Sequence, residues 1–104
     1  MQIQVNHDHT IEGSAGLRAH VESIVENSLG HFQQRITRVE VHLTDENGGK
    51  PGTDDKRCVM EARLEGRHPS AVTHHAGTID DAIDGAAEKL KRSIESTLGR
   101  LQGR

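Results

Sequence analysis

The chain has 104 residues, of which 32% are hydrophobic and 28% charged, with a formal net charge of −3 at pH 7 and one aromatic residue, Phe32. This length predicts a single domain with a thin, aliphatic core. The lone Cys58 excludes an intramolecular disulfide and is typical of a reducing compartment. Because the sequence has no signal-peptide pattern and no apolar run near ~18 residues, we expect a cytoplasmic protein.

Alternation and helical spacing of apolar residues divide the chain into six predicted elements. Three segments alternate between polar and apolar side chains, as half-buried strands do, and a fourth does so less clearly. Two longer segments repeat apolar residues every three or four positions and begin at the potential N-caps Ser14 and Thr78. The expected elements are a strand at 1–5, a helix at 14–29, strands at 38–44, 57–65 and 70–76, and a helix at 78–101.

This order, β-α-β-β-β-α, predicts the fold class. Each strand has one apolar face and each helix one apolar stripe, which requires two layers. We therefore expect an α+β two-layer sandwich, in which a four-stranded sheet carries both helices on one face. Residues 45–56, rich in glycine and aspartate, predict a flexible loop inside the single domain 1–104.

The charges of the last helix are sorted by sign. At ~100° per residue, they border the apolar stripe with Asp84, Glu88 and Glu95 along one edge and Lys89, Arg92 and Arg100 along the other. Salt pairing alone would interleave the signs, so the sorting indicates a flank that faces an anionic partner, with a solvated helix face as the alternative. Arg104 continues the basic side, which suits contacts to phosphates of structured RNA. Stacking on bases is disfavoured, because Phe32 looks like a core residue.

Catalytic and metal sites are not indicated. The eight histidines include His7 with His9 and the neighbours His74 and His75, but a structural zinc site needs four ligands at characteristic spacing. Adjacent residues of a strand also point to opposite faces. No nucleophile elbow, phosphate-binding loop or dinucleotide fingerprint occurs. We expect no enzyme, no metal, no cofactor and no small-molecule substrate.

Three groups of local motifs carry a family resemblance. They are Met1-Gln2-Ile3, Ile11-Glu12 and Leu17-Arg18 at the front; Phe32 and Ile36-Thr37-x-Val39-x-Val41-x-Leu43 in the middle; and Ala82-Ile83-Asp84-Gly85 with Lys89-Leu90-x-Arg92 at the back. With the order of elements, these motifs resemble the ribosome hibernation-promoting factor family, also known as ribosome-associated inhibitor A or sigma-54 modulation proteins. The similarity covers nearly the whole chain, and the last motif is the most specific.

The resemblance implies a stress or stationary-phase factor that binds the small ribosomal subunit near its decoding region and silences translation. Lys89 and Arg92 match basic positions of the family's second helix, and Arg18 matches an arginine of the first. The expected contacts to ribosomal RNA are Arg18, Lys89, Arg92, Arg100 and Arg104. The 104-residue sequence does not include the C-terminal dimerisation domain of the long family forms, so we expect ribosome pairing to need another hibernation factor.

Three features depart from the family pattern. Residues 26–30 lack the usual lysines, Asp80 stands where an aromatic residue is common, and the loop at 45–55 is acidic. They favour an alternative function, a divergent protein-interaction module on the same fold that uses the acidic loop and does not bind ribosomes.

Overall fold

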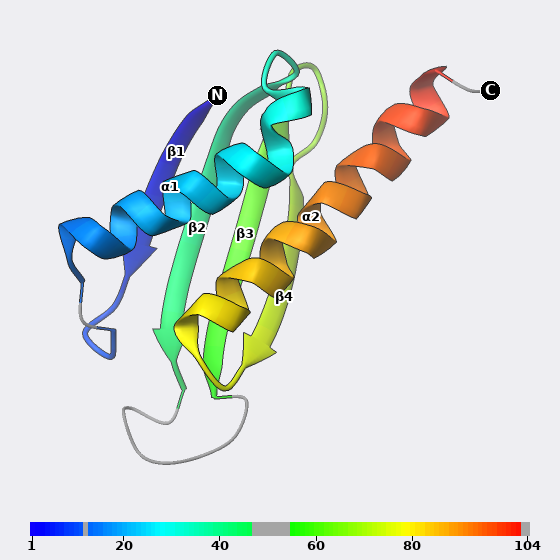
Figure 1. Cartoon of the computed structure of the whole chain (residues 1–104). Helices are drawn as coiled ribbons and strands as arrows, with labels where there is room; N and C mark the ends of the chain where they lie inside the picture. The colour runs from blue at the N-terminus through cyan, green and yellow to red at the C-terminus, as the bar shows by residue number, and fades with distance from the viewer. Residues whose placement is uncertain (12, 47–54, 103–104) are drawn as a thin grey trace.

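The computed structural model describes residues 1–11, 13–46 and 55–102, with the backbone alone for residues 100–102. Most of the loop expected at 45–56 therefore lies outside the described residues. The elements are β1 (Gln2–His7), α1 (Ala15–Leu29), a short 3-10 helix η1 (Gly30–Phe32), β2 (Ile36–Asp45), β3 (Lys56–Leu64), β4 (Ser70–Ala76) and α2 (Ile79–Gln102) (Figure 1). The predicted order of strands and helices is confirmed.

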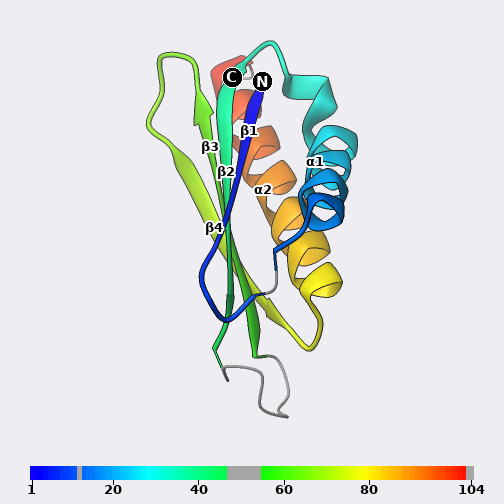
Figure 2. The same ribbon diagram turned by 90° about the vertical axis from the view of Figure 1, so that its left-hand side faces the viewer.

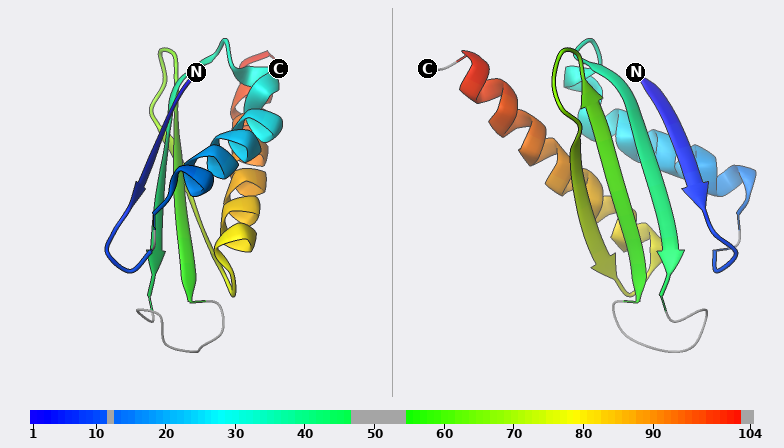
Figure 3. Two further views of the ribbon diagram at one scale, coloured as in Figure 1. Left: turned by 60° about the vertical axis from the view of Figure 1, so that its left-hand side comes forward. Right: turned by 180° about the vertical axis from the view of Figure 1, so that it is seen from behind.

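The four strands form one mixed sheet in the order β1-β2-β3-β4. β1 runs parallel to β2, whereas the β2–β3 and β3–β4 pairs are antiparallel. A parallel pair needs a crossover connection, and α1 provides it. Both helices cover the same face of the sheet, and the other face is open (Figures 2 and 3). The predicted two-layer α+β architecture is confirmed.

The core lies between the sheet and the helices. The inward residues of β2, Val39, Val41 and Leu43, are at most 1% exposed. Leu90 and Ile94 of α2, the helix that packs on β3 and β4, are 0% exposed. Their alternation in the strand and spacing in the helix follow from the two element periods. No helix in the described part of the chain is long and apolar enough to cross a membrane.

Both helices begin at the residues that the sequence indicated as N-caps. The Ser14 hydroxyl accepts a hydrogen bond from the Leu17 amide at 3.0 Å, and the Thr78 hydroxyl accepts one from the Asp81 amide at 3.1 Å. Each bond satisfies an amide that has no partner inside its helix. Each cap fixes the residue at which its helix begins, and thereby the positions of the basic residues along that helix.

Candidate nucleic-acid interface

Lys89 lies on the flank of α2 that faces the β4 edge of the sheet. Its ammonium donates a hydrogen bond to the carbonyl oxygen of Thr73 in β4 at 2.9 Å. β4 is an edge strand, and covering such an edge with another element and its charged side chains is a common protection against pairing with another chain. Lys89 therefore stabilises the contact between α2 and β4, and only part of its hydrogen-bonding capacity remains for a partner.

Arg92, one turn further along α2, is exposed and forms no ion pair with any described residue. The neighbouring Ser93 hydroxyl lies 2.7 Å from the hydroxyl of Ser70, the first residue of β4. This contact ties the middle of α2 to the start of β4, so Arg92 is displayed beside the β3–β4 connection with its guanidinium unneutralised.

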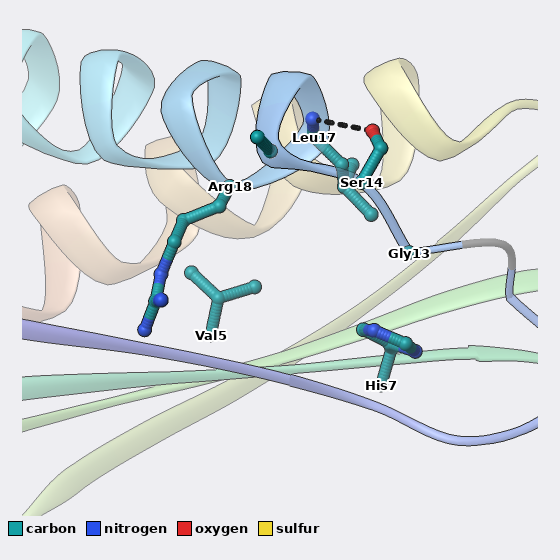
Figure 4. Close-up of a pocket in the computed structure, with 7 residues that line it drawn as sticks. Val5, His7, Gly13, Ser14, Leu17 and Arg18 are labelled. Atoms are coloured by element: carbon teal, nitrogen blue, oxygen red, sulfur yellow. Dashed lines mark hydrogen bonds between the residues drawn. The ribbon is translucent and has the colours of Figure 1, made fainter.

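Arg18 lies at the other side of the molecule. Its side chain is 61% exposed, with Nε 3.8 Å from a carboxylate oxygen of Glu22. It lines an open pocket of about 420 Å³ together with Val5 and His7 of β1, and points from α1 toward that strand (Figure 4). An exposed pair of this kind contributes little to stability.

The structure does not bring the predicted RNA contacts together on one surface. Arg18 lies against β1 and Lys89 against β4, and these strands are the opposite edges of the sheet. The Arg100 side chain and the whole of Arg104 lie outside the described residues. Of the predicted set, Arg92 is the exposed and unpaired cation that the structure places.

Three further arginines belong to segments at one end of the sheet: Arg35 precedes β2, Arg63 lies near the end of β3, and Arg67 is in the β3–β4 turn. This end of the sheet lies beside η1 (Figure 1). The Glu65 amide donates to the carbonyl of Arg35 at 2.9 Å, which joins the residue before β2 to the residue after β3. The side chains of Arg35, Arg63 and Arg67 are exposed, and none forms an ion pair with a described residue. Together with Arg92 we call these residues the basic end.

The opposite end of the molecule is acidic. There the first turn of α2, the ends of β1 and β2 and the start of β3 contribute Asp8, Asp45, Glu46, Asp55, Asp80 and Asp81. The Lys56 ammonium lies 2.9 Å from Asp55 and 3.5 Å from Asp45. This hydrogen bond lowers the pKa of the Asp55 carboxyl and raises the pKa of Lys56. Charge is thus separated between the two ends of the molecule, in addition to the sorting along α2.

The sequence analysis missed the basic end because its residues come from separate segments. Arg63 belongs to a strand and Arg67 to a turn, so neither falls on the helical stripe that carried the prediction. Strand alternation alone places Arg63 on the open face of the sheet. Its proximity to Arg35 depends on the pairing of Ile36 with Leu64, which no periodicity reveals.

Asp80, the residue that replaces a common aromatic, has a local role. Its carboxylate lies 3.2 Å from Nε2 of His20, a contact between the start of α2 and α1. Asp80 also belongs to the first turn of α2, where acids stabilise the helix dipole. Asp80 therefore contributes to the start of α2 and to its contact with α1.

Comparison with known proteins extends these observations. The family model described as Sigma 54 modulation protein / S30EA ribosomal protein matches residues 3–102. No curated protein matches the chain with significant similarity. The N-terminal domain of Protein Y from Thermus thermophilus superposes with a TM-score of 0.75 at 18% identity, over 93% of this chain and 99% of that one. A ribosomal subunit interface protein from Coxiella burnetii gives 0.77 at 14% identity, over 95% and 99%. Likeness at these identities shows a shared fold.

Proposed function

The chain belongs to the sigma 54 modulation protein / S30EA ribosomal protein family, and we propose that it binds the small ribosomal subunit through phosphates of ribosomal RNA and silences translation. The match over residues 3–102 carries the proposal, because it spans every strand and helix of the structure. The family predicted from the sequence motifs is confirmed by this match.

The exposed cations support contact with a phosphate backbone. Arg92 has no carboxylate partner among the described residues, so its guanidinium is available for paired hydrogen bonds to phosphate oxygens. Such contacts release counterions from the nucleic acid and depend on shape more than on base sequence. Arg100 and Arg104 continue the proposed set, whereas Arg18 is a minor contributor from the β1 edge.

In the proposed mechanism the protein occupies a site on the small ribosomal subunit and catalyses no reaction. The bound domain would overlap the path of messenger and transfer RNA on the small subunit, under stress or in stationary phase, in the cytoplasm. Its rigid sheet and two capped helices present fixed charges, so little ordering accompanies binding.

Sedimentation of the purified protein with small subunits through sucrose tests this function. We expect the protein to pellet with the subunits at about 50 mM salt and to pellet less at about 200 mM, because phosphate contacts weaken as salt rises. A cell-free translation reaction should be inhibited by the same protein. A protein that stays in the supernatant at both salts would contradict the proposal.

Two neighbouring residues of α2 offer a matched pair of variants. R92E reverses the unpaired charge and should weaken subunit binding at least ~10-fold, since it removes a phosphate contact and adds a repulsive one. K91E makes the same change in net charge at the adjacent position, beside Glu88 and Glu95 on the acidic side of the helix, and should bind nearly as the wild type does. K89E is less informative, because the Lys89 bond to Thr73 would be lost as well.

A further inference from the structure

We propose that the basic end, formed by Arg35, Arg63, Arg67 and Arg92, is the surface that docks on the phosphates of the small-subunit RNA. The inference rests on the proposed function and deepens it, because it names the face that makes the contact. Three of these arginines belong to neither helix. The end of the two-layer sandwich, rather than the exposed side of the helices, would then meet the ribosome.

The backbone holds this surface in place. The amide of Glu65 donates to the carbonyl of Arg35 at 2.9 Å, and the Thr37 hydroxyl donates to the carbonyl of Arg63 at 3.2 Å. The turn that carries Arg67 is closed by a bond from its own amide to the Leu64 carbonyl at 3.0 Å. Two chain segments distant in sequence, 35–37 and 63–67, are thus fixed beside one another before any partner binds.

The side chains at this end keep their charge available. Two arginines outside the basic end form ion pairs, Arg38 with Glu40 and Arg18 with Glu22. Arg35, Arg63 and Arg67 are exposed and have no such partner among the described residues. An unpaired guanidinium offers a rigid fork of donors that matches phosphate geometry.

The distribution of acids favours this docking direction. Docking through the exposed side of the helices would press Asp84 and Glu88 against RNA phosphates, at an electrostatic cost. Two carboxylates lie beside the basic end: Glu65 bonds to Arg35 through its backbone amide, and Glu95 lines a surface pocket with Arg35. Docking through the basic end leaves the first turn of α2 and Asp55 at the far end of the molecule (Figure 1). The charge separation would also orient the protein as it approaches a polyanion.

A matched pair of double variants tests the surface. R35Q/R67Q and R57Q/K91Q each remove two positive charges from exposed or half-exposed sites, but only the first pair belongs to the basic end. One phosphate contact accounts for about fivefold in affinity at 0.15 M salt, so R35Q/R67Q should bind small subunits roughly 30-fold more weakly. The slope of log K against log salt should flatten by about 2. R57Q/K91Q should lose no more than about fivefold, and equal thermal unfolding of the variants by circular dichroism verifies that each is folded.

Failure of the inference can be told apart from failure of the function. If the wild type pellets with subunits and R35Q/R67Q binds as tightly as R57Q/K91Q, the proposed function is supported and the basic end is overturned as its surface. If the wild-type protein does not pellet with subunits at all, both the proposed function and the proposed surface are contradicted. Purified small-subunit RNA serves as the second probe, and a parallel loss there supports the inference. If R35Q/R67Q loses subunits but keeps full affinity for the RNA, the basic end contacts ribosomal protein and the RNA assignment is overturned.

Discussion

A single glycine shows how one residue links a helix to the sheet. Gly85 lies in the second turn of α2, where glycine costs about 1 kcal/mol relative to alanine. A Cβ at this position would lie 2.1 Å from Cδ2 and 2.2 Å from Nε2 of His74, which extends from β4. The glycine of the Ala82-Ile83-Asp84-Gly85 motif is therefore explained by the imidazole that covers it.

This packing predicts a coupling between two substitutions. G85A alone should give no gain or a loss in the free energy of unfolding, because the added methyl displaces the imidazole. In the H74A background the same change should stabilise the protein by about 1 kcal/mol, the helix propensity of alanine over glycine. Urea unfolding of the wild type, G85A, H74A and G85A/H74A measures these changes in the free energy of unfolding. G99A is a control, since a Cβ there meets nothing within 4 Å. Equal effects of G85A in both backgrounds would contradict the explanation.

At the scale of elements, the β2–β3 hairpin is secured by charges at its base. Lys56, the first residue of β3, lies between Asp45 at the end of β2 and its neighbour Asp55, and both carboxylate side chains are at most 5% exposed. The hydrogen bond from Lys56 lowers the pKa of Asp55 below its usual 3.8. The same bond raises the pKa of Lys56 above its usual 10.5.

These shifts predict how the hairpin responds to pH. A carboxyl with a lowered pKa stabilises the fold fully above its unfolded value and loses that contribution as pH falls through the folded value. The raised pKa of Lys56 acts in the opposite direction, and its contribution is lost only above pH 10.5. The difference in unfolding free energy between wild type and D55N should therefore stay constant from about pH 6 to 8 and shrink below about pH 4. Urea titrations across this range check it, and a gap that persists unchanged to about pH 3 would refute the role of Asp55.

Local sequence patterns predicted the elements well but not the interface. The bounds of β4 were predicted as the structure has them, although its alternation was the least clear. β1 extends two residues beyond the expected 1–5, because Asn6 and His7 pair with residues of β2. Phe32, expected in the core, is half-buried and lines a surface pocket with Arg35 and Leu98. Each difference arises from contacts between elements, which local periodicity does not contain.

Considered as a whole, the molecule is a dipole with its charges at the two ends of the sheet. The net charge of −3 suggests poor affinity for RNA, yet the exposed arginines at one end and the carboxylates around Lys56 at the other are separated in space. An anionic partner then meets a local surface of the opposite sign, and the distant acids are screened within about 10 Å at 0.1 M salt. Overall net charge is therefore a poor guide to the partners of this protein.

Replacing residues 47–54 by Asn-Gly tests whether the segment between β2 and β3 takes part in function. The Glu46 amide donates to the Asp55 carbonyl at 2.8 Å, so the two ends already lie at the spacing of a two-residue hairpin, which Asn-Gly closes as a type I′ turn. The replaced segment holds one lysine and one aspartate, so the net charge does not change. If the basic end docks on RNA, the shortened protein should pellet with small subunits at the same salt dependence as the wild type. Lost pelleting in a variant with an unchanged circular dichroism spectrum would contradict this, and would instead favour a protein partner bound through residues 47–54.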